Sequence, residues 1–400
     1  MPILRLFSTH GMFDLPHGDD DTVLDVLNSA QIAWASVALY VKEVGDSGFR
    51  LFPCLGTKMS EFGRNTLVAA FLQRNIDPTS YIHAHLKISD PADGNGAVAE
   101  YLYRDLSQRS GNTILRRFSR AECIQVVEEN VSSMLDQYFE KSGSGVAKIV
   151  IGVSGGGDSN ALISALEKYK SDKNIEIIPV IISGPGEWDA GISRAKDICD
   201  QLSLKLNVVS ELETREILGA TGEGPDLISR FGKQFPGEDY EFLGTLIIRR
   251  VLVHIAKLNN ARHICTGINF EDLIAEYFAW NLRGGMPPEL PVRKVDGVKL
   301  LFPLWKTPKK IIDGCYPKHS FANYEGRYPS FSPGRTLAYQ LAYVLTSDFP
   351  GVGEKLLDSS AELSTRLGSP LVFDADLGFD TLGPIPMALR LAHKRLLNAK

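Results

Sequence analysis

The chain has 400 residues, a formal net charge of −5 and a pI near 6.0, with 44% hydrophobic, 23% charged and 9% aromatic residues. This balance is typical of a soluble globular protein and excludes a generally basic protein that coats nucleic acid. The length exceeds one ordinary core, so we expect about two or three domains. The sequence shows neither an apolar run of membrane-spanning length nor a signal pattern, so we expect a cytoplasmic protein without membrane partners.

The cysteines are scattered, odd in number and never arranged as C-x-x-C. This pattern favours neither a disulfide framework nor a zinc ribbon. They are Cys54, Cys123, Cys199, Cys265 and Cys315.

The N-terminal part, residues 1–88, is expected to be a small α+β domain. An apolar strand over 3–7, a helix from Thr22 and a strand over 36–41 follow one another, an order that weakly resembles a β-grasp module. Residues 89–145 are expected to link the domains, with turn formers first and then an amphipathic bridging helix.

From residue 146 to 345 the pattern repeats strand and helix. This repetition predicts an α/β domain, a doubly wound parallel sheet covered by helices on both faces. Strands are expected over 148–153, 175–182, 204–209 and 263–267, and helices from Ala161, over 190–202 and over 243–258. The remaining residues, 346–400, are expected to form a helical tail.

The most informative stretch is Ser154-Gly155-Gly156-Gly157-Asp158-Ser159, between the first of these strands and its helix. A strand, glycine turn and helix bind anions, because glycine lets the backbone approach an oxyanion and the first helical N–H groups point at it. The glycine spacing fits neither the Walker loop nor the dinucleotide motif. A plain helix capped by Asp158 and Ser159 is the alternative, but a cap needs no three glycines.

The S-G-G-x-D-S pattern resembles the pyrophosphate loop of the N-type ATP pyrophosphatases, or PP-loop superfamily, which includes GMP and asparagine synthetases and tRNA-modifying enzymes. The resemblance implies an adenine nucleotide alpha-hydrolase-like fold, and ATP with Mg²⁺ as cofactors. It implies that the loop holds the leaving pyrophosphate while the α-phosphate passes to a substrate oxygen. The implied ATP contacts are Val153, Ser154, Gly155, Gly156, Gly157 and Ser159, with Asp158 as a catalytic residue.

A second segment, residues 266–278, resembles the G-H-H-x-D-D-x-x-x-T element of the 2-thiocytidine tRNA enzymes and tRNA-isoleucine lysidine synthetase. Glu271 and Asp272 match the two aspartates, while Ile268 and Asn269 replace the histidines. The resemblance implies that Asp158, Glu271 and Asp272 hold the metal and that Asp272 is catalytic. Acidic residues favoured by a helix N-terminus are the alternative explanation.

Further contacts follow from the expected sheet, because ligands lie at the carboxyl ends of parallel strands. We expect the nucleotide to contact Ser183, Gly267 and Asn269 at these ends, and Arg283 as one of the basic residues that can reach the triphosphate. A later Met286-Pro287-Pro288 run is similar to the thiocytidine branch in particular.

The sequence departs from that branch where sulfur is handled. The branch carries C-x-x-C before an arginine pair, whereas Phe242 and Thr245 precede Arg249-Arg250 here, so no iron–sulfur cluster is expected. Cys265, in an apolar strand, is expected to be a buried small hydrophobe. Cys315, in an expected loop among lysines, is the candidate sulfur carrier and catalytic residue, because nearby cations lower a thiol pKa.

Basic residues interleaved with aromatic ones between 283 and 335 predict either an RNA-binding surface or an ordinary polar face. Lys306 is expected to reach the triphosphate as a catalytic cation. The basic residues are Arg283, Arg293, Lys294, Lys306, Lys309, Lys310, Lys318, Arg327 and Arg335, and the aromatic ones are Trp305, Tyr316, Phe321, Tyr324 and Tyr328.

The resemblance implies an enzyme that adenylates a carbonyl-type oxygen, releases pyrophosphate, and lets a sulfur or nitrogen nucleophile displace AMP. Thiolation-like modification of a nucleobase, in tRNA or free, is the main hypothesis. An amide-forming ligase of the asparagine synthetase type is the alternative, and a nucleotide-sensing scaffold a third. The partners are then a nucleobase, RNA or small-molecule acceptor and a sulfur- or nitrogen-donor protein; the oligomeric state stays open, a homodimer included.

Overall fold

The computed structural model describes residues 2–8, 11–30, 32, 37–46, 50–51, 55–72, 87–104, 113–139, 146–171, 173–184, 186–220, 240–282, 289–316, 333–367, 371–374, 379–382 and 391. The chain divides into two compact units, and each is described by itself. Unit 1 comprises 1–126, 308–328 and 343–353; unit 2 comprises 127–307, 329–342 and 354–400.

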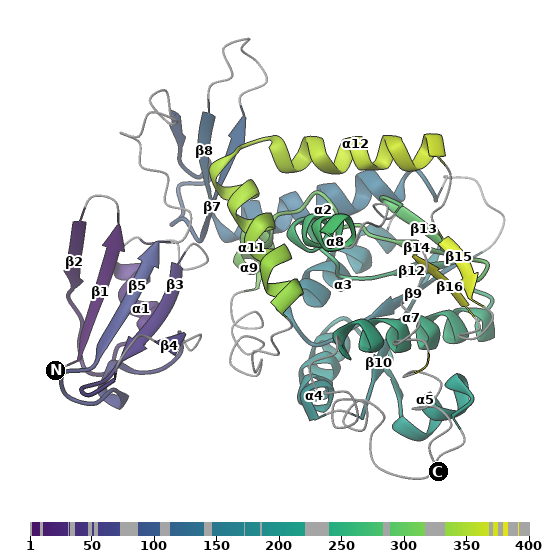
Figure 1. The fold of residues 1–400 in the computed structure, drawn as a ribbon, viewed down its shortest axis with the longest axis horizontal. Coiled ribbons are helices and arrows are strands. Elements are labelled where there is room, and N and C mark those ends of the chain that lie inside the picture. The colour runs from purple at the N-terminus through teal and green to yellow at the C-terminus, as the bar shows by residue number, and fades with distance from the viewer. Residues whose placement is uncertain are drawn as a thin grey trace. The chain divides into compact units, whose positions relative to one another are not determined.

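Unit 1 begins with a five-stranded mixed sheet in the order β2-β1-β5-β3-β4 (Figure 1). Strands β1 and β5 are parallel, and the other neighbours are antiparallel. The likeness to a β-grasp module expected for residues 1–88 stays a prediction. The elements are β1 Ile3–Ser8, β2 Gly11–Leu15, α1 Val23–Ser29, β3 Val37–Lys42, β4 Arg50–Leu51, a 3₁₀ turn Met59–Glu61 and β5 Leu67–Leu72.

Helix α1 begins where its sequence provides a cap. The Thr22 hydroxyl accepts a hydrogen bond from the Asp25 N–H at 3.1 Å, and the Asp25 carboxylate accepts one from the Thr22 N–H at 3.0 Å. These reciprocal bonds satisfy two helix N–H groups that have no partner within the helix. The apolar side of α1, with Val26 and Leu27, lies in a core that includes Leu4 and Val68.

A second, three-stranded sheet in unit 1 has the order β6-β8-β7. It is formed by β6 Lys87–Ser89, β7 Ala99–Arg104 and β8 Thr113–Phe118, and is followed by α2 Arg120–Leu135. The expected boundary at residue 88 therefore falls inside unit 1, because β6 pairs with β8.

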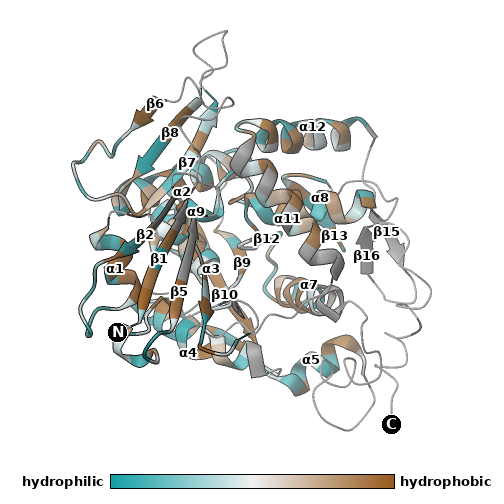
Figure 2. Ribbon diagram, turned by 60° about the vertical axis from the view of Figure 1, so that its left-hand side comes forward, coloured by the Kyte–Doolittle hydropathy of each residue, from teal (hydrophilic) through white to brown (hydrophobic). Residues whose placement is uncertain are grey.

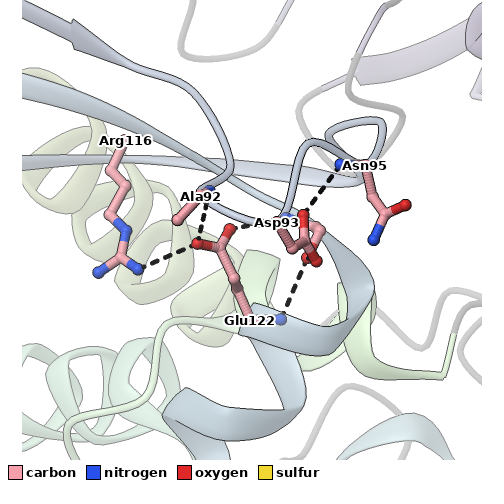
Figure 3. Close-up of polar contacts among 6 residues, drawn as sticks. Ala92, Asp93, Asn95, Arg116 and Glu122 are labelled. Atoms are coloured by element: carbon pink, nitrogen blue, oxygen red, sulfur yellow. Dashed lines mark hydrogen bonds and ion pairs between the residues drawn. The ribbon is translucent and has the colours of Figure 1, made fainter.

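The turn over 90–98 is fixed to the start of α2 (Figure 3). The Glu122 carboxylate accepts hydrogen bonds from the N–H groups of Ala92 and Ser119, both at 3.1 Å. The Asp93 carboxylate accepts one from the Ser119 hydroxyl at 2.5 Å and one from the Asn95 N–H at 3.0 Å. These bonds hold the pKa of Asp93 below its ordinary value, the bond from Ser119 being the largest cause. The turn-rich sequence thus forms an ordered cap for α2.

Unit 2 contains a six-stranded sheet in the order β11-β10-β9-β12-β14-β13. All neighbours are parallel except β13 and β14, which form an antiparallel hairpin. The strands are β9 Ala147–Gly152, β10 Ile175–Ile182, β11 Asn207–Val209, β12 His263–Cys265, β13 Val292–Val295 and β14 Val298–Leu301.

The helices of unit 2 connect these strands in two directions along the sheet. From β9 the chain moves to β10 and β11, and then returns past β9 to β12 and β14. Because such crossovers are right-handed, the two directions place helices on opposite faces, so the predicted doubly wound α/β fold is confirmed. These helices are α3 Gly157–Lys170, α4 Gly186–Gln201, α5 Glu211–Leu218, α7 Tyr240–Leu258 and α8 Phe270–Leu282.

Hydrophobic patterning explains this arrangement. Along β10 all residues except Glu176 are buried, as expected for a strand covered on both faces. Figure 2 shows β9 and β10 in hydrophobic colours, whereas α4 alternates between hydrophobic and hydrophilic ones. This alternation is typical of a helix with one face on a sheet and the other in solvent.

Three features differ from the sequence-based expectations. Helix α3 begins at Gly157 rather than at Ala161, because Gly156 is its N-cap residue with extended backbone. The β13–β14 hairpin was not predicted; it turns at Asp296 and Gly297, both with positive φ. The C-terminal segment contains helices and also the hairpin of β15 and β16. Its elements are α11 Pro333–Asp348, α12 Val352–Leu367, β15 Leu371–Asp374 and β16 Phe379–Leu382.

No helix in the described part of the chain has both the length and the apolar composition needed to cross a bilayer.

Candidate functional site

The candidate site lies where the strand order reverses, between β9 and β12 of unit 2. These strands are hydrogen-bonded neighbours, yet their following helices run in opposite directions along the sheet. At such a point the two connecting loops separate and leave room for a ligand. Val153, which is buried, and Ser154 follow β9, and Gly267 follows β12. Ser183 follows β10, the other neighbour of β9, and donates its N–H to the Val209 carbonyl.

The glycine loop presents the first turn of α3 to this edge of the sheet. Because α3 begins at Gly157, its first N–H groups have no acceptor within the helix, which is the arrangement that binds anions at helix N-termini. The hydroxyls of Ser154 and Ser159 lie 3.3 Å apart, and the Ser159 hydroxyl donates to the Gly156 carbonyl at 3.1 Å. The loop thus combines backbone donors with two hydroxyls, the groups that a polyphosphate requires.

Two glycines let the loop pack against helix α4. Gly155 has a φ of +73°, and a Cβ there would lie 2.4 Å from the Gly191 carbonyl oxygen. A Cβ on Gly191 would lie 2.3 Å from the Ser154 carbonyl oxygen. Arg194, one turn further along α4, donates from Nε to the Gly155 carbonyl at 3.1 Å. Helix α4 therefore fixes the shape of the loop.

The loop after β12 approaches the glycine loop from the other side. A Cβ on Gly267 would lie 3.1 Å from the Ser159 nitrogen, so glycine allows the two backbones to meet. The Asn269 amide donates from Nδ2 to Asp158 Oδ1 at 3.3 Å. Its Oδ1 accepts from the Asp272 N–H, and Asp272 Oδ2 accepts from the Asn269 N–H, both at 3.1 Å. Asn269 therefore caps α8 and links Asp272 to Asp158.

A tyrosine from a distant helix completes this network. The Tyr339 hydroxyl, on α11, donates to Asp272 Oδ1 at 2.6 Å. Both oxygens of Asp272 thus accept hydrogen bonds, one from Tyr339 and one from the Asn269 N–H. Hydrogen bonds to both oxygens hold the orientation of this carboxylate.

The three predicted metal-binding carboxylates are not equivalent. Asp158 and Asp272 are partly exposed and joined through Asn269, whereas Glu271 is 1% exposed within α8. No group of three His, Cys, Asp or Glu side chains in the described ranges has a metal-binding arrangement. Mg²⁺ bound to nucleotide phosphates needs one or two protein carboxylates, and the metal-binding role of Asp158 and Asp272 stays a prediction. The burial of Glu271 does not support a role as a third ligand.

Lys306 lies on the turn after β14. Its ammonium is 2.7 Å from an Asp358 carboxylate oxygen of α12 and 4.5 Å from the centre of the Trp305 ring. Its side chain is exposed. The catalytic role predicted for Lys306 stays a prediction.

The location predicted for Cys315 is wrong. This residue is not in a loop but ends α9, Lys309–Cys315, in unit 1, and its Sγ donates to the Ile311 carbonyl at 3.3 Å. Its side chain is fully buried, which does not support a nucleophilic role. The neighbouring Gly314 is closely packed as well, since a Cβ there would lie 2.7 Å from the Cys123 sulfur.

The other described cysteines are buried as well. Burial raises the pKa of Cys123 to about 12 and that of Cys199 to about 11. Burial also raises the pKa of Cys265, which lies in β12 as the small hydrophobe expected from the sequence. A thiol in such surroundings is protonated at neutral pH and is not a nucleophile.

Several of the basic residues predicted to form an RNA-binding surface are not exposed. Arg293 and Lys310 are buried, and Lys309 is 2.7 Å from Asp313 within α9. These residues are therefore unavailable for tracking an RNA backbone. Several others lie outside the described residues, or have side chains that do: Arg283, Lys318, Phe321, Tyr324, Arg327, Tyr328 and Arg335.

Three residues of the site were missed in the sequence. Gly191 and Arg194 contact the glycine loop from α4, and Tyr339 binds Asp272. A glycine inside an expected helix is a weak signal of close packing, and Gly191 has this signal. Arg194 and Tyr339 have no local signal, because their contacts depend on the fold.

No family model matches the chain, and no curated protein does. Among solved structures, the chain is similar to the U34-tRNA thiolase NcsA from Methanococcus maripaludis with its [4Fe-4S] cluster. The TM-score is 0.50 and the identity 18%, over 65% of this chain and 83% of that one.

Two synthetases are also similar to it. The NMN synthetase from Francisella tularensis has a TM-score of 0.37 and 16% identity, over 62% of this chain and 95% of that one. The NH3-dependent NAD synthetase from Campylobacter jejuni has a TM-score of 0.34 and 13% identity over the same shares, 62% and 95%. The α/β unit with its glycine loop at the switch point and the likeness to the thiolase structure agree: this chain has the fold of the PP-loop ATP pyrophosphatases.

Proposed function

We propose that this protein is an ATP pyrophosphatase that activates an acceptor by adenylation. The observation that carries the proposal is the meeting of the Ser154–Ser159 loop with the Asn269–Asp272 turn at the switch point of the sheet. One turn offers N–H and hydroxyl donors, and the other offers carboxylates. This combination suits a triphosphate bound together with Mg²⁺.

In the proposed reaction, an acceptor oxygen forms a bond to the α-phosphorus of ATP and the bond to the β-phosphate oxygen breaks. The N–H groups at the start of α3 and the hydroxyls of Ser154 and Ser159 would bind the leaving pyrophosphate, because negative charge increases on it. Asp158 and Asp272 would hold Mg²⁺, which neutralises charge on the phosphates. A nucleophile then attacks the activated carbon, and AMP leaves with the acceptor oxygen.

The described cysteines favour a nucleophile from solution or from a donor protein. All four are buried, and the pKa is raised for Cys123, Cys199 and Cys265. This observation supports free sulfide or a nitrogen nucleophile over a persulfide on these residues. Amide formation on a small acid is therefore the second candidate beside nucleobase thiolation, which the name of the similar tRNA thiolase supports.

The test is to incubate the protein with ATP, Mg²⁺, candidate acceptors and either sulfide or ammonium. The acceptors are bulk tRNA, free nucleobases and small carboxylic acids. A true acceptor should give AMP and pyrophosphate in equal amounts, and Asp158→Asn should remove both products. Asp197→Asn, on an exposed part of α4, is the matched control and should leave them unchanged. Release of ADP and inorganic phosphate would contradict the proposal.

A further inference from the structure

Helix α4 contacts one particular peptide group of the glycine loop, the one that joins Gly155 to Gly156. Arg194 donates from Nε to the Gly155 carbonyl at 3.1 Å. This peptide is trans, because among the described residues the cis form occurs only at Leu290-Pro291. In a trans peptide the C=O and the N–H point in opposite directions. The N–H of Gly156 therefore points away from the Arg194 guanidinium.

The N–H of Gly156 lies toward the two hydroxyls of the candidate site. It donates to Ser154 Oγ at 3.4 Å, which is at the long limit of hydrogen bonding, and Ser154 Oγ lies 3.3 Å from Ser159 Oγ. A phosphate oxygen is a stronger acceptor than a hydroxyl at this distance, so it can take over the N–H. The donor side of this peptide thus lies toward the groups proposed to bind pyrophosphate, and its carbonyl side lies toward α4.

The next peptide of the loop is held by the helix itself. The Gly156 carbonyl accepts from the Asn160 N–H at 3.0 Å, a bond of the first turn of α3. The peptide between Gly155 and Gly156 lies outside the helix. A half-turn of its plane would change φ of Gly156 from −91° to about +90°, which glycine adopts readily. It would also turn a carbonyl oxygen toward the anion and repel it. The hydrogen bond from Arg194 opposes this rotation.

We propose that Arg194 is a positioning residue of the glycine loop, whose hydrogen bond keeps the N–H of Gly156 directed at the pyrophosphate part of bound ATP. This role rests on the function proposed above, because it requires that the loop binds pyrophosphate. The guanidinium stays charged at every physiological pH, so it polarises the carbonyl and makes the N–H of the same peptide a stronger donor. Arg194 acts through the backbone and need not touch the nucleotide.

The test compares two substitutions that differ in one donor group. In Arg194→Gln the amide nitrogen lies as many bonds from the backbone as Nε of arginine, so it can donate to the same carbonyl without the charge. Arg194→Met has a similar length and no donor. Calorimetric titration measures the affinity of each variant for inorganic pyrophosphate with Mg²⁺. Arg194→Met should weaken it by about tenfold or more, the loss of one charge-assisted hydrogen bond. Arg194→Gln should stay within about threefold of the wild type, because salt screens the lost charge.

Lys196→Met is the matched control, because it removes an exposed cation from the same helix. This variant should bind pyrophosphate as the wild type does. Equal losses in Arg194→Gln and Arg194→Met would overturn the inference, since the charge and not the hydrogen bond would then matter. Unchanged affinity in Arg194→Met would overturn it as well. Absence of binding by the wild type is a different result, which contradicts the proposed function and the role of Arg194 with it.

A spectroscopic measurement separates this role from general support of the fold. Glycine labelled with ¹³C at the carbonyl and ¹⁵N at the amide gives carbonyl-correlated amide signals only where one glycine follows another, at Gly156, Gly157 and Gly285. Saturating pyrophosphate should move the Gly156 signal downfield in the wild type and in Arg194→Gln, and not in Arg194→Met. The Gly157 signal should move in all three proteins, because α3 holds its peptide. An equal shift of Gly156 in all three would refute the inference.

Discussion

The close packing of Gly155 against Gly191 predicts that adding one methyl group at Gly155 destabilises the protein. In Gly155→Ala the new Cβ would lie 2.4 Å from the Gly191 carbonyl oxygen and 3.1 Å from the Ala195 nitrogen, both backbone atoms. Neither can move without shifting α4 or the glycine loop. The backbone at Gly155 also has a φ of +73°, which an alanine adopts at a cost of about 1–2 kcal/mol.

Gly297 provides the control, because it has a φ of +83° and no atom within 4 Å of an added Cβ. Gly297→Ala should therefore lower the free energy of unfolding by the conformational cost alone, about 1–2 kcal/mol. Gly155→Ala should lose a further 1–3 kcal/mol, roughly, from overlap with the backbone. The difference between the variants isolates the steric term.

Urea unfolding followed by circular dichroism measures both free energies. A nucleotide test accompanies it: ATP with Mg²⁺ should raise the melting temperature of Gly297→Ala but not of Gly155→Ala, because the displaced loop no longer presents its donors. Equal destabilisation of the two variants, or an intact ATP shift in Gly155→Ala, would refute the close packing of the loop on α4.

Three further predictions concern other contacts of unit 2. Asn269→Ala removes the cap of α8 and the bond to Asp158, so the free energy of unfolding should fall by about 1–2 kcal/mol and the ATP-induced rise in melting temperature should shrink. Asn259→Ala, which removes only a bond to the Ile255 carbonyl, should leave the ATP effect unchanged. Tyr339→Phe removes the hydrogen bond that orients the Asp272 carboxylate, so the affinity for ATP with Mg²⁺ should fall by about three- to tenfold. Calorimetric titration measures this affinity, and an unchanged value would exclude the orienting role of Tyr339. The pKa of His263 is lowered to about 4 by burial, then by Lys299 and Arg262, so the unfolded state binds more protons between about pH 4 and 6.5. The free energy of unfolding should therefore fall as the pH decreases through this window. After allowance for solvent screening, the fall should be about 1–2 kcal/mol larger in the wild type than in His263→Gln. Parallel pH profiles of the two proteins would contradict this prediction.

The α/β unit was predictable because its signals are local. Continuous β-branched runs such as Ile175–Ile182 mark buried parallel strands, and three glycines before a helix mark close backbone approach. The start of α3 was placed four residues late, since glycine is a poor helix former and gives no sign that it begins one.

The surroundings of Cys315 were not predictable, because its neighbouring lysines are typical of a solvated loop. In the structure Lys309 binds Asp313 within the same helix, and Lys310 is buried. Tyr339 illustrates the other limit: it reaches Asp272 across 67 residues of sequence. A contact of this kind depends on how helices pack, and no periodicity or motif indicates it.

The departure from the histidine motif at Asn269 acquires a physical meaning in the structure. One amide caps α8 through its oxygen and donates to Asp158 through its nitrogen, so a single side chain connects the two turns of the site. An imidazole at this position would change its charge near neutral pH, whereas the amide does not titrate. The link between Asp158 and Asp272 therefore keeps the same donor and acceptor at every physiological pH.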